Sequence, residues 1–423
     1  EISACLVGSE MCIRDRYGAG EREFPKLGYA AQLMNNAGIM GAYEPQELKE
    51  ELSKLNATCH VTADEDNLYI IMEGYEATLP QACQLLSRQI LMPKLDEKQL
   101  ARLKGSAMGM RQQRKDNVSI LNEALRQYML YGEKSDYIKE LTDKEIYELQ
   151  ISELTGDINR ASNYEAKVFF TGTLPFDQVY DILSKNLPLV ANERPSNSPQ
   201  AKEMMPVTEN TVYFLPNNDA EQAQIHLYIP MQKADKKDDV LRSAFNQYFG
   251  LDFTGIVLNE IREKRSMAYT AYAFVGTQGI AGKASYLRGY IGTQNDKAND
   301  ALDVLMSLVN DMPKNPERIG NIKSYLRQAM LTSHPSFRNK AMELVDLGYR
   351  GYTDDPAKEN LPKVDALTFD DIVKFYEENI KGKPYCISIM GNPKDIDLKR
   401  LEKFGKVVKL NERKLFNTKD ALF

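Results

Sequence analysis

The stretch Tyr69–Leu91, YIIMEGYEATLPQACQLLSRQIL, reads as a β-strand that runs into an amphipathic helix. Its first half is rich in β-branched and aromatic residues, and after Gly74 the apolar residues recur at helical spacing. The same organisation returns in Gly289–Val309, GYIGTQNDKANDALDVLMSLV, where Gly292 takes the place of Gly74. This pattern predicts that one strand-and-helix unit occurs twice in the chain.

A second pair of segments supports the repeat. Both AKVFFTGTLP and KPYCISIMGNP follow a helical stretch, and their strands end at Gly172 and Gly391. The spacing of this pair nearly equals that of Gly74 and Gly292, which is expected for duplicated domains. We place the domain break within residues 191–208, ANERPSNSPQAKEMMPVT, where Pro, Asn, Ser and charge replace apolar periodicity.

The pattern predicts an α+β fold with two homologous domains, residues 17–195 and 206–423. Strand candidates such as QIHLYI (residues 224–229) alternate apolar and polar residues, which is typical of an antiparallel sheet covered on one face by helices. His226 falls on the face opposite Ile225 and Leu227. We therefore expect His226 to be a half-exposed sheet residue rather than a metal ligand.

Residues 1–16, EISACLVGSEMCIRDR, differ in character from the rest of the chain. They lack the basic start and long apolar core of a secretory signal. The run resembles translated sequencing-adapter readthrough, so we expect a non-native tail, with the natural reading frame resuming at about Tyr17. The alternative is a genuine, unstructured extension, and in either case these residues are set aside in reasoning about function.

Composition excludes several classes of function. The 423 residues are 43% hydrophobic and 27% charged, and no apolar run approaches the length that spans a bilayer. A net charge of -6 argues against a nucleic-acid-binding surface. The five cysteines show no C-x-x-C spacing, so neither a thiol site nor a disulfide framework is indicated.

The segment LNEIREKRSMAYTAYAFVG (residues 258–276) carries the candidate binding pair, Arg262 and Tyr269. A guanidinium and a phenolic hydroxyl that converge on one cleft can bind peptide carbonyls or the oxyanion formed when a carbonyl is attacked. The alternative is that Arg262 belongs to a solvated, charged helix face and that Tyr269 packs in a sheet. The residues alone leave both interpretations open.

This segment resembles the substrate-binding Arg/Tyr signature of the pitrilysin/insulinase family of zinc metallopeptidases. The resemblance extends over nearly all of the chain from Tyr17 and is most specific in FNQYFG, IVLNEIREKRSMAYTAYA and YIGTQNDKANDAL. It is strongest to the C-terminal half of long, four-domain bacterial members, of the kind found in Bacteroidetes. The resemblance implies that Arg262 and Tyr269 bind substrate in a chamber whose chemistry is performed by another half.

The family's zinc motif, H-x-x-E-H, is absent. Aligning Gly38 with the family's Gly-Thr places Tyr29, Gln32 and Leu33 where His, Glu and His are expected. A phenol, an amide and a leucine cannot replace two zinc ligands and the general base. The downstream Glu ligand is also missing, because residues 98–115 contain no acidic side chain.

The resemblance therefore implies a non-catalytic, substrate-binding half of a zinc-dependent endopeptidase, inactive alone. This chain would hold no cofactor, and zinc is expected in a missing N-terminal half. The alternative is a stand-alone non-catalytic subunit that binds or scaffolds a zinc-bearing partner; a third possibility is an unrelated α+β binding module. The expected partners are peptides and a zinc-bearing half, in cis or in trans. The resemblance further implies the bacterial periplasm or cell envelope.

Overall fold

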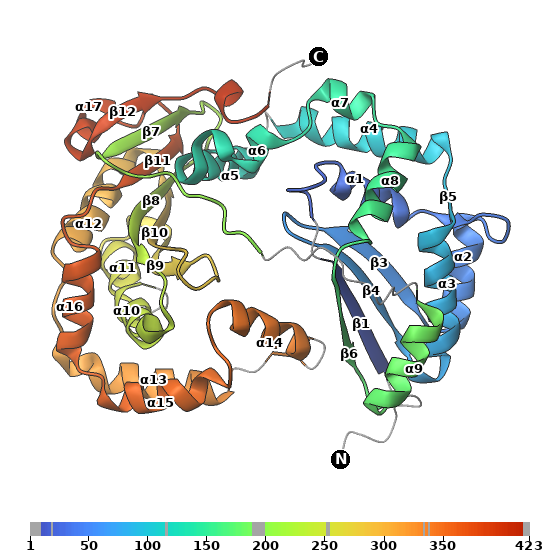
Figure 1. Ribbon diagram of the computed structural model, residues 1–423. Coiled ribbons are helices and arrows are strands. Elements are labelled where there is room, and N and C mark those ends of the chain that lie inside the picture. Colours follow the sequence, from blue (N-terminus) through green and yellow to red (C-terminus); the bar gives the residue numbers. More distant parts are fainter. Residues whose placement is uncertain are drawn as a thin grey trace.

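The first lobe is built on a four-stranded antiparallel sheet with the strand order β3-β4-β1-β6 (Figure 1). The computed structural model describes residues 10–17, 20–114, 117–187, 199–250, 254–332, 335–336 and 339–417. The strands of this sheet are β1 (Glu10–Tyr17), β3 (Thr58–Ala63), β4 (Leu68–Tyr75) and β6 (Ala166–Thr171). A separate short pair is formed by β2 (Gly38–Ile39) and β5 (Pro93–Lys94).

Helices cover one face of this sheet and enclose the core of the lobe. They are α1 (Leu27–Met34), α2 (Pro45–Lys54), α3 (Leu79–Leu91), α4 (Glu97–Gln113), α7 (Asp143–Tyr147), α8 (Ile151–Ala161) and α9 (Phe176–Asn186). The predicted apolar stripe of α3 is in the core, where Leu79, Ala82 and Leu86 are buried. A capping box between Asp96 and Gln99 fixes the start of α4.

The second lobe contains a six-stranded sheet with the order β12-β7-β11-β8-β10-β9. Its strands are β7 (Thr211–Pro216), β8 (Gln222–Lys233), β9 (Ala268–Thr277), β10 (Ala284–Gln294), β11 (Cys386–Gly391) and β12 (Lys406–Lys409). Its helices are α10 (Asp239–Phe249), α11 (Ile256–Leu258), α12 (Ala298–Asn310), α13 (Ile319–Thr332), α14 (Lys340–Tyr349), α15 (Pro356–Ala366), α16 (Phe369–Asn379) and α17 (Leu398–Leu401).

The two lobes repeat one topology, and the α+β prediction is confirmed. The order β9-β10-β8-β11 in the second sheet matches β3-β4-β1-β6 in the first. The second sheet is not purely antiparallel, however, because β7 runs parallel to both β11 and β12. The expectation of two antiparallel sheets is therefore correct for the first lobe and wrong for the two added strands of the second.

The strand registers match Gly172 with Gly391 but shift the other pair of glycines by one position. In the first sheet, Glu73 of β4 and the residue before Gly172 in β6 both pair with the same residue of β1, which lies between them. In the second sheet, Gly292 of β10 and the residue before Gly391 in β11 both pair with the same residue of β8. Gly292 is therefore the counterpart of Glu73 rather than of Gly74, and the match of Gly74 with Gly292 was wrong.

Strand β1 includes residues that the sequence analysis set aside. Glu10–Tyr17 pairs with β4 on one side and β6 on the other, so this segment is an inner strand and not an unstructured extension. Sheet pairing uses backbone N–H and C=O groups, which any sequence without proline supplies. The pairing therefore carries no information on the origin of residues 1–16, and the adapter origin stays a prediction.

A helix from the first half of the sequence lies on the sheet of the second lobe. Helix α5 (Val118–Tyr131), followed by α6 (Asp136–Lys139), packs against β8 and β11 (Figure 1). Leu121 and Leu125 of α5 are buried with Leu215 and Met390 of the sheet. Because α10, α12 and α16 cover the other face, the second sheet is covered on both faces, which corrects the one-face expectation.

Helix α14 makes the reciprocal crossing. It contacts β6 of the first lobe, and the Lys167 ammonium lies 6.0 Å from the centre of the Tyr349 ring. The proposed domain break at 191–208 lies partly outside the described residues, which resume at residue 199, and the domain limits stay a prediction. Among the helices that the structure describes, none combines the length and apolar character needed to cross a bilayer.

Candidate functional site

Arg262 lies on a π-helical turn, Asn259–Glu263, that continues α11. The Lys264 N–H donates to the Asn259 carbonyl at 2.9 Å, across five residues rather than four. Ile261 is buried in the core of the second lobe, which fixes the opposite side of the turn. Single π-turns are uncommon and frequently occur at functional sites.

The turn ends in a hydrogen-bond pattern that reverses the chain toward β9. The Met267 N–H donates to the Ile261 carbonyl at 3.0 Å, and the Ser266 N–H donates to the Arg262 carbonyl at 2.9 Å. Each of these bonds spans one residue more than the corresponding bond of a Schellman motif, in which the residue of positive φ is usually glycine. Ser266 takes that position with φ of 48°, a backbone conformation that is unfavourable for residues other than glycine.

Tyr269 lies at an irregularity of the β9–β10 ladder. Thr270 pairs with Gly292 and Ala268 pairs with Thr293, so Tyr269 is the extra residue of a β-bulge. Bulges turn a side chain away from the regular alternation of a strand. The Tyr269 side chain is accordingly 77% exposed, and the Arg262 guanidinium carbon lies 5.6 Å from the centre of its ring.

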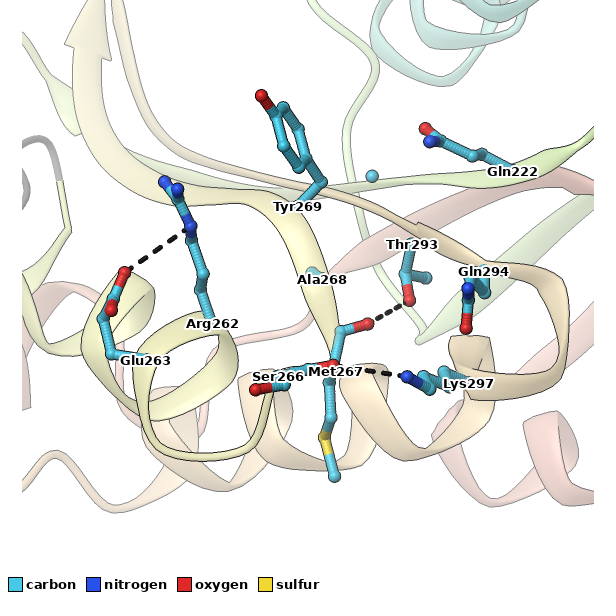
Figure 2. Close-up of a pocket in the computed structure, with 11 residues that line it drawn as sticks. Gln222, Arg262, Glu263, Ser266, Met267, Ala268, Tyr269, Thr293, Gln294 and Lys297 are labelled. Atoms are coloured by element: carbon cyan, nitrogen blue, oxygen red, sulfur yellow. Dashed lines mark hydrogen bonds and ion pairs between the residues drawn. The ribbon is translucent and has the colours of Figure 1, made fainter.

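The structure brings the predicted pair together. Figure 2 shows the Arg262 and Tyr269 side chains projecting to the same side, from the π-turn and from the start of β9. The alternative of a tyrosine packed in the sheet is inconsistent with this exposure. On the same charged segment, Glu260 forms ion pairs with Lys264 and Arg265, while Arg262 lies 3.5 Å from Glu263. The substrate-binding role of Arg262 and Tyr269 stays a prediction.

A cavity of about 520 Å³ borders the pair. Its lining is mainly polar and comes from the start of β8, the segment around Ser266 and the end of β10. The lining residues are Gln222, Arg262, Glu263, Ser266, Met267, Ala268, Tyr269, Gly292, Thr293, Gln294 and Lys297. A polar cavity beside an exposed guanidinium and phenol can hold a short peptide segment through its backbone and polar groups.

Two side chains that the sequence analysis did not single out hold the floor of this cavity. The buried Thr293 hydroxyl donates to the Met267 carbonyl. The Lys297 ammonium donates to the Ser266 carbonyl at 3.3 Å. Both lie in YIGTQNDK, which had served only as a marker of the repeat, and the sequence carries no signal for their contact with residues 266–267.

Helix α1 carries the three residues that the sequence analysis aligned with the family's zinc motif, and these residues do not fit zinc. Leu33 is 2% exposed in the core, Gln32 points to solvent, and burial raises the pKa of the half-buried Tyr29. None of the three offers the imidazole or carboxylate donors that zinc uses. Within the described ranges, no group of three or more His, Cys, Asp or Glu side chains could hold a metal ion.

His226 is buried, which corrects the expectation of a half-exposed residue. Helix α5 covers it, and its Nε2 lies 3.0 Å from Asn122 Oδ1. Burial, reinforced by the charge of Arg288, lowers the pKa of His226 to about 3. The imidazole is therefore neutral at ordinary pH and packs against Tyr290, with the ring centres 5.1 Å apart.

The family described as "Peptidase M16 inactive domain" matches residues 162–323, a range that includes both Arg262 and Tyr269. Over this range the chain is therefore similar to the M16 peptidase family, which is the pitrilysin/insulinase family. Within that family the matched range corresponds to the inactive, C-terminal type of domain. No curated protein sequence matches the chain.

Solved structures share the fold at low sequence identity. The M16 inactive domain from Pseudomonas fluorescens aligns with a TM-score of 0.70 and 17% identity, over 92% of this chain and 94% of that chain. The periplasmic protease PqqL from Escherichia coli gives 0.70 and 13%, over 92% of this chain but 43% of PqqL. A conserved protein from Enterococcus faecalis gives 0.71 and 15%, over 93% and 95%.

Proposed function

We propose that this chain is the substrate-binding, non-catalytic half of a zinc-dependent endopeptidase that cleaves peptides in an enclosed chamber. The convergence of Arg262 and Tyr269 at one polar cavity carries the proposal. A guanidinium has fixed donors and a phenol has one, and together they can bind peptide carbonyls. Three local irregularities produce this geometry: the π-turn, positive φ at Ser266 and the bulge at Tyr269.

The zinc chemistry is assigned to a second half, in the same protein or in a partner subunit. The degenerate positions Tyr29, Gln32 and Leu33 support this division, because they leave α1 without zinc ligands. The share of PqqL that aligns with this chain, 43%, supports an origin within a longer protein of that size. The periplasmic location given for PqqL supports a periplasmic or envelope location here.

A separate non-catalytic subunit is the second arrangement. The chain aligns over 94% of the P. fluorescens chain and 95% of the E. faecalis chain, which favours a unit of this length. In that arrangement the zinc-bearing half is supplied in trans, and Arg262 and Tyr269 keep the same role.

Reconstitution tests the proposal. The purified chain is mixed with a zinc-bearing M16 half from the same genome, and hydrolysis of a quenched fluorescent peptide is followed. We expect no hydrolysis by this chain alone and peptide cleavage by the mixture well above that of the zinc-bearing half alone. Hydrolysis that is unchanged by adding this chain, despite complex formation, would contradict the proposal.

A further inference from the structure

Lys297 is a partly buried residue whose ammonium lies on the wall of the cavity beside Arg262 and Tyr269. It donates to the Ser266 carbonyl at 3.3 Å, and this single bond leaves donor capacity on the ammonium. Among the side chains described by the structure, no carboxylate lies within ion-pair distance of Lys297. An ammonium with free donors and no counter-charge of its own can bind an anionic group.

The cavity carries an excess of positive charge. Arg262 and Lys297 both line it, and Glu263 is the one acidic residue among its lining groups. Glu263 lies 3.5 Å from Arg262, so its charge is directed to that guanidinium and not to Lys297. The other cations of the segment differ, because Lys264 and Arg265 are both paired with Glu260.

The remaining wall suits an anion that is part of a peptide. Gln222 and Gln294 contribute amide groups, and the Thr293 hydroxyl is committed to the Met267 carbonyl. A carboxylate is the anionic group that an unmodified peptide offers, as an Asp or Glu side chain or as the C-terminus. In Figure 2 Lys297 approaches the segment around Met267 from the side opposite Arg262. Because Arg262, Tyr269 and Lys297 line the same cavity, a peptide that fills it meets a second, separate cation.

We infer that Lys297 binds a carboxylate of the bound peptide and gives this site a preference for acidic peptides. The inference rests on the proposed function and adds a specificity determinant to it. Arg262 and Tyr269 contact the backbone and bind peptides of any composition. Lys297 adds the selection by charge.

Peptide binding to the full chain tests this inference by isothermal titration calorimetry. The probes are short peptides of one sequence that carry Glu or Gln at successive positions, each with a free or an amidated C-terminus. At low salt we expect one Glu-containing or free-acid form to bind about three- to fivefold more tightly than its neutral counterpart. The Glu/Gln arm and the acid/amide arm identify which carboxylate is bound, and added salt should reduce the preference.

Variants separate charge recognition from support of the cavity floor. Lys297→Met should abolish the ratio between acidic and neutral peptides, and Lys297→Arg should retain it. Arg265→Met, which removes a cation paired outside the cavity, should leave the ratio unchanged. A uniform loss of affinity in Lys297→Met, with the ratio preserved, would show that Lys297 only supports the floor and would overturn the inference.

The same titrations distinguish failure of this inference from failure of the proposed function. If Arg262→Lys and Tyr269→Phe weaken all peptides while acidic and neutral forms bind the unmodified chain equally, only the Lys297 inference fails. If no peptide binds the unmodified chain, both fail.

Discussion

Asn35 and Asn246 hold the edge strands of the two lobes in the same way. Asn35 accepts a hydrogen bond from the Val61 N–H at 2.7 Å and donates to the Val61 carbonyl at 2.8 Å. Asn246 forms the same pair of bonds with Val275, at 2.6 and 3.0 Å. Each amide thus occupies the outward backbone groups of one edge-strand residue, which also protects that edge from pairing with another chain.

Replacing either asparagine by alanine should destabilise its lobe. The backbone N–H and C=O groups of Val61 or Val275 would lose their partners in a partly buried setting, at a cost of about 1 to 3 kcal/mol. Chemical denaturation of Asn35→Ala and Asn246→Ala measures the loss. Asn218→Ala, at an exposed position, is the control, and equal stability of all three variants would contradict this account.

Glu76 and Asn295 form a second matched pair, and they explain why Gly172 and Gly391 recur. Glu76 accepts hydrogen bonds from the residues just after Gly172, and Asn295 accepts one from the residue after Gly391. An added Cβ would lie 2.2 Å from Glu76 Oε1 at Gly172, and 2.6 Å from Asn295 Oδ1 at Gly391. The glycines leave room for these carboxylate and amide groups.

Alanine at Gly172 or Gly391 should therefore lower the thermal unfolding temperature. Overpacking of this kind costs about 1 to 3 kcal/mol. Gly105→Ala is the matched control, because nothing lies within 4 Å of the added Cβ inside helix α4. There we expect stabilisation of about 0.5 to 1 kcal/mol. A gain in stability at Gly172 or Gly391 would refute the packing argument.

Local periodicity was sufficient to predict the repeat but not the contacts between its copies. The apolar residues of α3 and α12 recur at helical spacing in the sequence, so the order of strand and helix could be predicted from it. The crossing of α5 onto the second sheet was not, because the pattern of Val118–Tyr131 specifies an apolar face without specifying which sheet covers it. The burial of His226 follows from that crossing, so the expectation for His226 failed for the same reason.

At the candidate site, the sequence located Arg262 and Tyr269 but not the geometry that brings them together. A π-turn adds one residue to a helical turn and a bulge adds one residue to a strand. Periodicity does not detect such single-residue insertions. Thr293 and Lys297 were missed because they reach the site through the tertiary contact between β10 and β9.

His226 should make stability depend on pH in the acidic range. Its pKa is about 3 in the folded chain and about 6.5 when unfolded, so between these values the unfolded state binds more protons. Stability should consequently fall as pH decreases through this window. His226→Gln keeps an N–H that can reach Asn122 but does not titrate, and it should flatten the dependence. Identical pH profiles for the two proteins, measured by urea denaturation, would exclude this role.

The purified chain should retain no stoichiometric zinc after mild chelation. Tyr29, Gln32 and Leu33 present no imidazole or carboxylate on α1, and zinc held there would lack its usual ligands. Elemental analysis by mass spectrometry measures the zinc content, with a zinc-bearing M16 half as the positive control. Zinc at one equivalent per chain would require a different assignment of the ligand positions.

In the reconstituted enzyme, replacing Tyr269 or Arg262 should slow turnover while leaving folding intact. Loss of one fixed donor to a reacting carbonyl typically costs about a hundredfold in kcat, so Tyr269→Phe should be readily detected. Arg262→Lys should also be harmful, because an ammonium does not reproduce the fixed donors of a guanidinium. The 77% exposure of Tyr269 means that its hydroxyl is available without any change in packing. Arg265→Ala is the control: it removes a side chain paired with Glu260 on the same segment and should leave kcat nearly unchanged. If all three variants hydrolyse peptide at the unmodified rate, Arg262 is a solvated helix residue and the cavity beside it does not bind the reacting part of the substrate.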